Sequence, residues 1–190
     1  YALRANMTRD EFIREVTDGL LAPPTYFPQN VLMNKQGYES IETVLNRGDQ
    51  SLSPEAFEAA ANETGAVVLD VRSAQVFSKG FIPNSINIGL GGQFAPWVGA
   101  LIPDVRQTLL LVCESGTEQE TLTRLARVGY DQVLGYLSEG FRAWADSGKE
   151  IDTITSISAD ELADRLEQGP VPVIDVRKSG EFTAEHADGA

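Results

Sequence analysis

Apolar and polar positions along this chain change their period in a way that predicts helices and strands in turn. From residue 53 onward, short continuous apolar runs, which suit buried parallel strands, alternate with stretches of helical periodicity. We expect strands at 66–69, 86–88, 108–112 and 132–134, and helices at 53–61, 93–101, 117–128 and 141–147. Strands that alternate with helices imply an α/β domain with a mainly parallel sheet.

The first 50 residues follow a different pattern. Residues 8–16 begin with a capping sequence and continue as a short amphipathic helix. Residues 22–28 contain three prolines, which restrict their own backbone and that of the preceding residue, so we expect an extended N-terminal arm there. Tyr26 and Phe27 of this arm should pack against other parts of the chain. Residues 37–48 allow one or two further helical turns.

Part of the chain is repeated. The sequence Val-Leu-Asp-Val-Arg at 68–72 recurs as Val-Ile-Asp-Val-Arg at 173–177, an offset of 173 − 68 = 105 residues. The same offset, without a gap, relates Ser53 to Ser158, Phe77 to Phe182, Phe81 to His186 and Ser85 to Ala190. The repeating unit is therefore about one domain long, and its second copy stops after about a third of its length. We expect the chain to be a piece of a longer protein.

Composition and charge restrict the possible partners. Of the 190 residues, 42% are hydrophobic, which allows one good core, and the net charge is −13. Nucleic acids and anionic membrane surfaces require clustered positive charge, so we expect neither as a partner. No apolar run approaches the roughly 18 residues of a membrane span. A single cysteine excludes an internal disulfide framework and favours a reducing, cytoplasmic location.

Cys113 is the candidate for chemistry. It directly follows the most apolar expected strand, and sites in open α/β folds lie at the carboxyl ends of strands. The short loop Glu114–Ser115–Gly116 could turn its backbone N–H groups inward, where they and the following helix N-terminus would stabilise a thiolate or a bound anion. The alternative is that Cys113 is a small buried hydrophobic residue, as free cysteines most often are. Position alone leaves both interpretations open.

Several segments, in this order, resemble rhodanese-like domains. They are Asp70–Arg72, Gly80–Ile88, Gly129–Val133 and Gly140–Trp144, together with an active-site loop formed by Cys113, Glu114, Ser115, Gly116, Thr117 and Glu118. The resemblance implies a three-layer α/β fold with a five-stranded mainly parallel sheet. It also implies sulfane-sulfur transfer, in which a donor passes sulfur to Cys113 as a persulfide and an acceptor thiol removes it.

The N-terminal region resembles a different family. Residues 1–4, 11–13 and 23–30 are similar to the C-terminal tail of a metallo-β-lactamase-fold persulfide dioxygenase. Bacterial fusions of such a dioxygenase with one or two rhodanese domains resemble the whole chain. We therefore expect a dioxygenase tail and linker at 1–48, a rhodanese-like domain at 49–152, and the start of a second, incomplete rhodanese-like domain at 153–190. The partners expected are the flanking domains of the same polypeptide.

The resemblance also bears on cofactors. A dioxygenase of this kind implies iron, which we expect only in the part of the dioxygenase domain that this chain lacks. No cofactor and no metal site are expected in the chain itself, which has a single histidine. That residue, His186, lies in the signature of the second copy, which explains it without a metal.

The loop departs from the family pattern in ways that oppose catalysis. Glu118 stands where the family usually has an arginine, and Phe81 stands where it usually has a histidine. A carboxylate about 6 Å from a thiolate destabilises it by roughly 2–3 kcal/mol, so Glu114, Glu118 and Glu120 should raise the pKa of Cys113. We also expect a capping box in which the Thr117 hydroxyl caps the helix and Glu120 bonds back to Thr117.

These departures favour a pseudo-rhodanese, with the fold kept and catalysis weak or lost, that scaffolds its flanking domains in a protein of sulfide and persulfide metabolism. The alternative is an active sulfurtransferase that carries sulfur on Cys113. A regulatory phosphatase-like module is disfavoured, because the loop lacks both the extra residue and the arginine of that class. Asp70 and Arg72 should bridge structure, and Trp97 and Trp144 should lie in the core.

Overall fold

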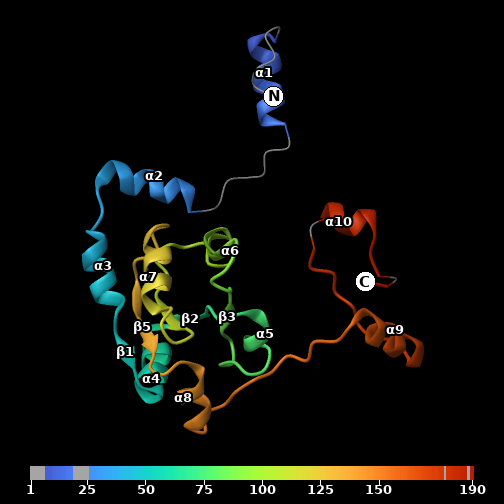
Figure 1. Cartoon of the computed structure of the whole chain (residues 1–190). Coiled ribbons are helices and arrows are strands. Elements are labelled where there is room, and N and C mark those ends of the chain that lie inside the picture. The colour runs from blue at the N-terminus through green and yellow to red at the C-terminus, as the bar shows by residue number, and fades with distance from the viewer. Residues whose placement is uncertain (1–6, 19–25, 178, 188) are drawn as a thin grey trace. The chain divides into compact units, whose positions relative to one another are not determined.

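The computed structural model describes residues 7–18, 26–177, 179–187 and 189–190. The chain divides into two compact units, residues 1–153 and residues 154–190. The elements, all but β4 labelled in Figure 1, are α1 (Arg9–Thr17), α2 (Phe27–Gln36), α3 (Ile41–Gly48), β1 (Ser51–Leu52), α4 (Pro54–Thr64), β2 (Val67–Asp70), α5 (Ala74–Phe77), β3 (Ile86–Asn87), α6 (Phe94–Leu101), β4 (Leu109–Val112), α7 (Glu118–Ala126), β5 (Val133–Leu137), α8 (Phe141–Asp146), α9 (Ala159–Gln168) and α10 (Ser179–Ala184).

Five parallel strands form one sheet in the order β1-β5-β4-β2-β3. Strand β4 lies at the centre between β2 and β5, and all four of its residues are completely buried. Continuous apolar sequence therefore marks a strand that is covered on both faces. The predicted five-stranded parallel sheet is confirmed.

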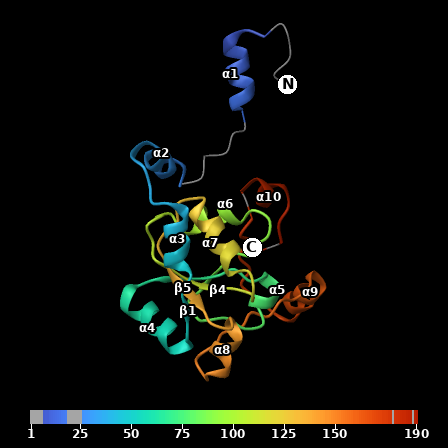
Figure 2. The same cartoon turned by 60° about the vertical axis from the view of Figure 1, so that its left-hand side comes forward.

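Helices cover both faces of the sheet and give three layers (Figure 2). The core on one face contains Phe94 of α6 and Leu122 and Leu125 of α7, and Leu45 of α3 packs against it. The core on the other face includes Phe57 of α4 and Trp144 of α8. Trp144 is buried as expected.

Trp97 of α6, however, is 57% exposed, so the prediction that it lies in the core is wrong. The sequence Phe-Ala-Pro-Trp-Val-Gly-Ala-Leu of α6 is apolar on every side. Periodicity therefore cannot indicate which face of this helix points inward.

The N-terminal region differs from the extended arm that the sequence predicts. Residues 22–25 lie outside the described residues, but 27–36 form helix α2, with Pro28 in its first turn. Proline is accepted there because the N–H it lacks would have no partner within the helix. Tyr26 is buried, as expected, and it lies so close to Gly99 that a Cβ at residue 99 would overlap its ring. Phe27 is half-exposed and contacts Tyr26 edge-on, with ring centroids 5.3 Å apart.

The helix starts follow from local sequence. Ser53 accepts a hydrogen bond from the Ala56 N–H and begins α4, as predicted. Thr8 and Glu11 form the expected capping box at the start of α1. The short elements β1 and α5 were not predicted, because two to four residues show no measurable periodicity.

Residues 154–190 form the second unit, which contains α9 and α10. Ser158 and Glu161 form a capping box at the start of α9. Within the described part of this unit no strand forms. Among the helices that the structure describes, none is long and apolar enough to cross a membrane.

Candidate functional site

The loop that follows β4 and the first residue of α7 together hold every residue of the predicted site. Cys113 directly follows the last residue of β4, at the carboxyl end of the central strand. Gly116 turns the loop with a φ of 89°, a conformation that glycine adopts without strain. Helix α7 begins at Glu118, so the loop passes directly from the strand to the helix.

Cys113 is only 2% exposed. It continues the alternation of Leu109 and Leu111, and all three belong to the core beneath α6 and α7. Its Sγ lies 3.8 Å from the Thr121 hydroxyl oxygen. That hydroxyl donates its only hydrogen to the Thr117 carbonyl oxygen at 2.8 Å. Thr121 therefore accepts from the thiol, which is an arrangement that fits the protonated form of Cys113.

The surroundings of Cys113 disfavour a thiolate. Burial is the main cause that raises the pKa of Cys113 from its ordinary value of 9.0 to about 12, and the carboxylates of Glu118 and Asp70 raise it further. A hydrogen bond from Thr121 to the thiolate would lower this pKa, but Thr121 could donate it only by releasing the Thr117 carbonyl. The predicted direction of the Glu118 effect is confirmed, although burial is the larger cause.

Glu118 interacts with the loop itself. Its carboxylate accepts a hydrogen bond from the Gly116 N–H at 2.8 Å. A backbone N–H that could have held a bound anion is therefore occupied by a side chain of the same loop. Glu114 and Ser115 are exposed.

The expected capping box at the start of α7 does not form. The Thr117 hydroxyl donates to the Glu114 carbonyl at 2.8 Å and makes no cap bond, and Glu120 pairs with Arg124 at 2.7 Å. Within the tight loop the Thr117 hydroxyl bonds to a backbone carbonyl instead of the helix N-terminus, and Arg124, four residues after Glu120, is an alternative partner for its carboxylate. Glu120 therefore does not face Cys113 in the way the sequence suggested.

A shallow cavity of about 440 Å³ lies beside the loop. Cys113, Glu114 and Ser115 line it together with residues that sequence reasoning missed, among them Glu139, Phe141 and Arg142. These residues follow β5, which ends next to β4. The neighbouring positions of parallel strand ends could have indicated them.

Gly140 explains why the β5 loop can approach so closely. Its φ is 62°, and a Cβ there would lie 2.8 Å from the Cys113 carbonyl oxygen. Only glycine combines this conformation with this contact.

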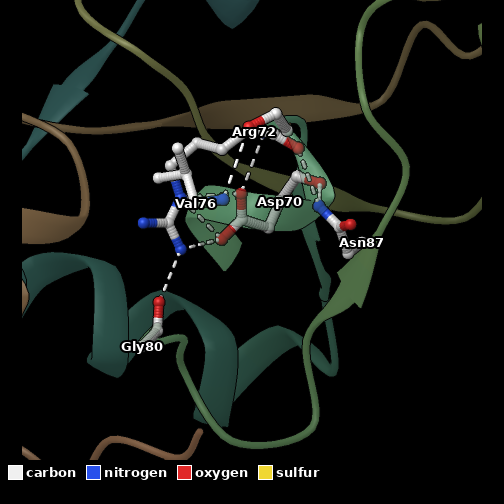
Figure 3. A network of polar contacts seen from close by, with 6 residues as sticks. Asp70, Arg72, Val76, Gly80 and Asn87 are labelled. Carbon is white, nitrogen blue, oxygen red and sulfur yellow. Dashed lines mark hydrogen bonds and ion pairs between the residues drawn. The ribbon is translucent and has the colours of Figure 1, made fainter. Parts of the chain in front are cut away.

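Arg72 also lines the cavity, but its guanidinium is already bound (Figure 3). Its Nε and Nη2 donate to the Asp70 carboxylate at 2.9 and 2.6 Å, and Nη2 also donates to the Gly80 carbonyl at 2.9 Å. Both side chains are nearly completely buried. The Phe141 ring lies 4.4 Å from the guanidinium carbon. The expectation that Asp70 and Arg72 bridge structure is confirmed.

Phe81, the second departure from the family pattern, has a packing role. Its ring stacks on Phe77 with centroids 4.2 Å apart, and both residues are buried. An apolar side chain at residue 81 therefore completes an aromatic pair.

The site thus brings together Cys113, the loop that follows it and the start of α7. Thr121, the hydrogen-bond partner of the thiol, was missed, although it lies one helical turn after Thr117 in the sequence. Within the described residues, no group of three or more His, Cys, Asp or Glu side chains could hold a metal ion.

Solved structures with a similar fold come from several sources. A metallo-beta-lactamase from Staphylococcus aureus subsp. aureus COL matches 70% of this chain and 36% of its own, with 22% identity and a TM-score of 0.53. A thiosulfate sulfurtransferase from Pseudomonas aeruginosa matches 76% of this chain and 27% of its own, with 21% identity and a TM-score of 0.46. A rhodanese-related protein from Thermoplasma volcanium matches 54% of this chain and 97% of its own, with 20% identity and a TM-score of 0.42.

This chain spans 36% of the length of the staphylococcal protein, and at 22% identity the likeness concerns the fold alone. No curated protein matches the sequence. The family comparison is more specific, because the rhodanese-like domain family matches residues 53–147, which make up half of the chain and include the whole Cys113 loop. This chain belongs to the rhodanese-like domain family.

Proposed function

We propose that this rhodanese-like domain is a pseudo-rhodanese, non-catalytic or weakly active, that scaffolds the domains on either side of it. The observation that carries the proposal is the state of Cys113, which is 2% exposed and donates its thiol hydrogen toward Thr121. Sulfur transfer requires a thiolate that a donor can reach. Cys113 meets neither requirement, because its thiol is protonated and it is buried.

The loop supports the same proposal. A rhodanese loop binds anionic sulfur donors through its backbone N–H groups and positive charge, but here the Gly116 N–H bonds to Glu118. The two guanidinium groups that line the cavity are also engaged with carboxylates. Arg72 is held by buried Asp70, and Arg142 lies 3.3 Å from Asp146 in an exposed pair. An anionic donor would have to displace these contacts.

For the longer protein we propose a fusion that metabolises sulfide and persulfide. The N-terminal sequence similar to a persulfide dioxygenase supports it. So does the likeness to a metallo-beta-lactamase chain in which a region of this fold occupies about a third of the length. A metallo-β-lactamase-fold domain would carry the iron, and this domain would dock it. The partners are then the flanking domains of the same polypeptide.

Intact-mass analysis after exposure to a low-molecular-weight persulfide tests the proposal, with Cys113→Ser as the control. We expect no added sulfur on the wild-type chain while circular dichroism shows that it is folded. An increase of about 32 Da on the wild type alone would mean that Cys113 carries a persulfide and that the proposal is wrong.

The second candidate function is active sulfur transfer, which the cavity favours because Cys113 contributes to its lining. In that reaction the thiolate attacks the outer sulfur of the donor, the donor's S–S bond breaks, and the donor leaves as a thiol. The same mass measurement distinguishes the two functions.

A further inference from the structure

A second cavity lies apart from the one beside Cys113. It has a volume of about 410 Å³ and lies between α2, α3 and the end of α7 (Figure 1). The two cavities have no lining residue in common. Volumes of roughly 300–1,000 Å³ are typical of sites for small molecules, so this cavity is large enough for one.

Gly129 allows α2 to form one wall of this cavity. A Cβ at residue 129 would lie 2.9 Å from Asn30 Oδ1 and 3.2 Å from Met33 Sδ. Both distances are shorter than ordinary van der Waals contact, so a larger side chain would push α2 away from the turn that follows α7. The wall that α2 supplies therefore depends on this glycine.

The Asp131 carboxylate lines the cavity and, among the described residues, forms no hydrogen bond or ion pair. Arg47 bonds elsewhere, because its Nη1 pairs with the Glu39 carboxylate at 2.8 Å and its Nη2 donates to the Asp131 carbonyl oxygen at 3.0 Å. Burial raises the pKa of Asp131, Arg47 opposes this shift and Glu39 adds to it. An ammonium group beside Asp131 would stabilise the charged form of its carboxyl group.

Arg127 brings the opposite charge to the same cavity. It directly follows the last residue of α7, it is exposed, and its guanidinium forms no ion pair within the part of the chain that the structure describes. A positive and a negative side chain, each without an ion pair, therefore line one space. The side-chain amides of Asn30 and Asn34 add neutral hydrogen-bond donors and acceptors.

Four apolar side chains also line the cavity, those of Met33, Ile41, Val44 and Ala126. Val44 is buried, whereas Ile41 is half-exposed. An aliphatic group in the cavity would remove more of this apolar surface from water. A further charged group would lose hydration there without gaining a partner.

We propose that this cavity binds a free α-amino acid with an apolar side chain. The ammonium group of the ligand pairs with Asp131, its carboxylate pairs with Arg127, and its side chain lies against the four apolar side chains. A zwitterion satisfies both charges of the cavity at once through charge-assisted hydrogen bonds. The proposed site includes no residue of the Cys113 loop, so this function is separate from sulfur transfer.

Ligands with a single charge fit the cavity less well. An anion would meet Asp131 and Glu39 in a chain of net charge −13. An amine, or the N-terminus of a peptide, would leave Arg127 without a partner. A metal ion is disfavoured, because the described residues contain no group of three or more His, Cys, Asp or Glu side chains that could hold one.

Isothermal titration calorimetry of the full chain with L-leucine tests the proposal. L-Leucinamide keeps the ammonium group but lacks the carboxylate, as a peptide N-terminus does. N-Acetyl-L-leucine keeps the carboxylate but lacks the ammonium group. Each analogue loses one charge-assisted interaction, so we expect each to bind at least about 10-fold more weakly than L-leucine.

Two variants assign these preferences to residues. Arg127→Gln should abolish the preference for L-leucine over L-leucinamide, and Asp131→Asn should abolish the preference for L-leucine over N-acetyl-L-leucine. Asp104→Asn and Arg106→Gln are matched controls, because they change an exposed ion pair outside the cavity, and both preferences should persist in them. Arg127 is exposed, so Arg127→Gln keeps the test decisive if circular dichroism shows that Asp131→Asn does not fold.

Saturable binding of L-leucine with both preferences, each lost in its own folded variant, supports the proposal. The proposal is overturned if L-leucine shows no saturable binding up to about 10 mM, or if Arg127→Gln leaves both preferences intact. Equal binding of L-leucinamide and L-leucine also overturns it, because the site would then recognise an amine or a peptide N-terminus. Equal binding of N-acetyl-L-leucine overturns it in favour of an anion site. Cys113→Ser should bind L-leucine as the wild type does, so the outcome is independent of the pseudo-rhodanese proposal.

Discussion

Removing the Arg72 guanidinium should destabilise the rhodanese-like domain more than most single substitutions. Arg72→Met keeps an apolar chain of similar length but removes the hydrogen bonds to the Asp70 carboxylate and to the Gly80 carbonyl. Asp70 is 0% exposed, so its charge would remain buried without its partner. Breaking a buried pair in this way costs about 3–5 kcal/mol, a large part of the stability of a domain of this size.

Urea unfolding followed by circular dichroism measures this effect. With a slope typical of small domains, the expected loss lowers the unfolding midpoint by about 1–3 M. Arg177→Met is the matched control, because it removes the same set of hydrogen bonds from a guanidinium that is 47% exposed. It should leave the midpoint unchanged, because exposed pairs contribute little.

A double variant separates the lost charge pair from the buried charge that remains. Asp70→Asn combined with Arg72→Met leaves no uncompensated charge, so we expect it to recover at least half of the stability that Arg72→Met loses. The reasoning is refuted if Arg72→Met shifts the midpoint by less than about 0.5 M, or if the double variant is as unstable as the single one.

Three further predictions concern the site and the packing of α2. Cys113 should react with iodoacetamide about 1,000-fold more slowly at neutral pH than a free thiol of pKa 9.0, and the alkylation rate, followed by mass spectrometry, should rise up to about pH 12. A profile of this rate against pH with its midpoint near pH 7 would contradict the prediction. Glu118→Ala should increase that rate less than 10-fold, because burial is the main cause of the raised pKa; a larger gain would assign the effect to the carboxylate. Gly99→Ala should destabilise the domain by about 1–3 kcal/mol in urea unfolding, since its Cβ would overlap the Tyr26 ring, whereas Gly91→Ala, in open space, should not; equal effects would exclude the steric explanation.

Much of the fold could be predicted because its signals are local. The apolar run that forms β4 and the Ser-Pro start of α4 each determine their own structure, and the repeat at 173–177 reproduces the Asp-X-Arg ion pair even where no sheet forms. An ion pair between residues two apart, such as Asp175 and Arg177, depends only on the short backbone segment that joins them. The sequence therefore predicts such features from a few neighbouring residues.

The features that sequence reasoning missed depend either on contacts that are distant in sequence or on a choice between competing local hydrogen-bond partners. Whether Trp97 faces the core depends on how α6 rests on the sheet, because α6 is apolar all round. The Thr117 hydroxyl could bond to the helix or to the loop, and the loop geometry decides in favour of the Glu114 carbonyl. The direction of Cys113, which its position alone leaves open, has a usable signal in the sequence. Alternation along β4 places residue 113 on the same face as Leu109 and Leu111, which is the core face.

The burial of Cys113 also affects how catalysis could be restored to this domain. The charge of Glu118 is the most visible departure from an active loop, and the sequence alone suggests that replacing Glu118 with arginine would restore activity. Burial, however, is the largest cause of the raised pKa, and the Thr121 hydroxyl is positioned to accept from the thiol. A charge change at residue 118 alters neither of these. An active site would therefore need two independent changes, one that removes the carboxylate from the Gly116 N–H and one that turns Sγ out of the core into the cavity beside it.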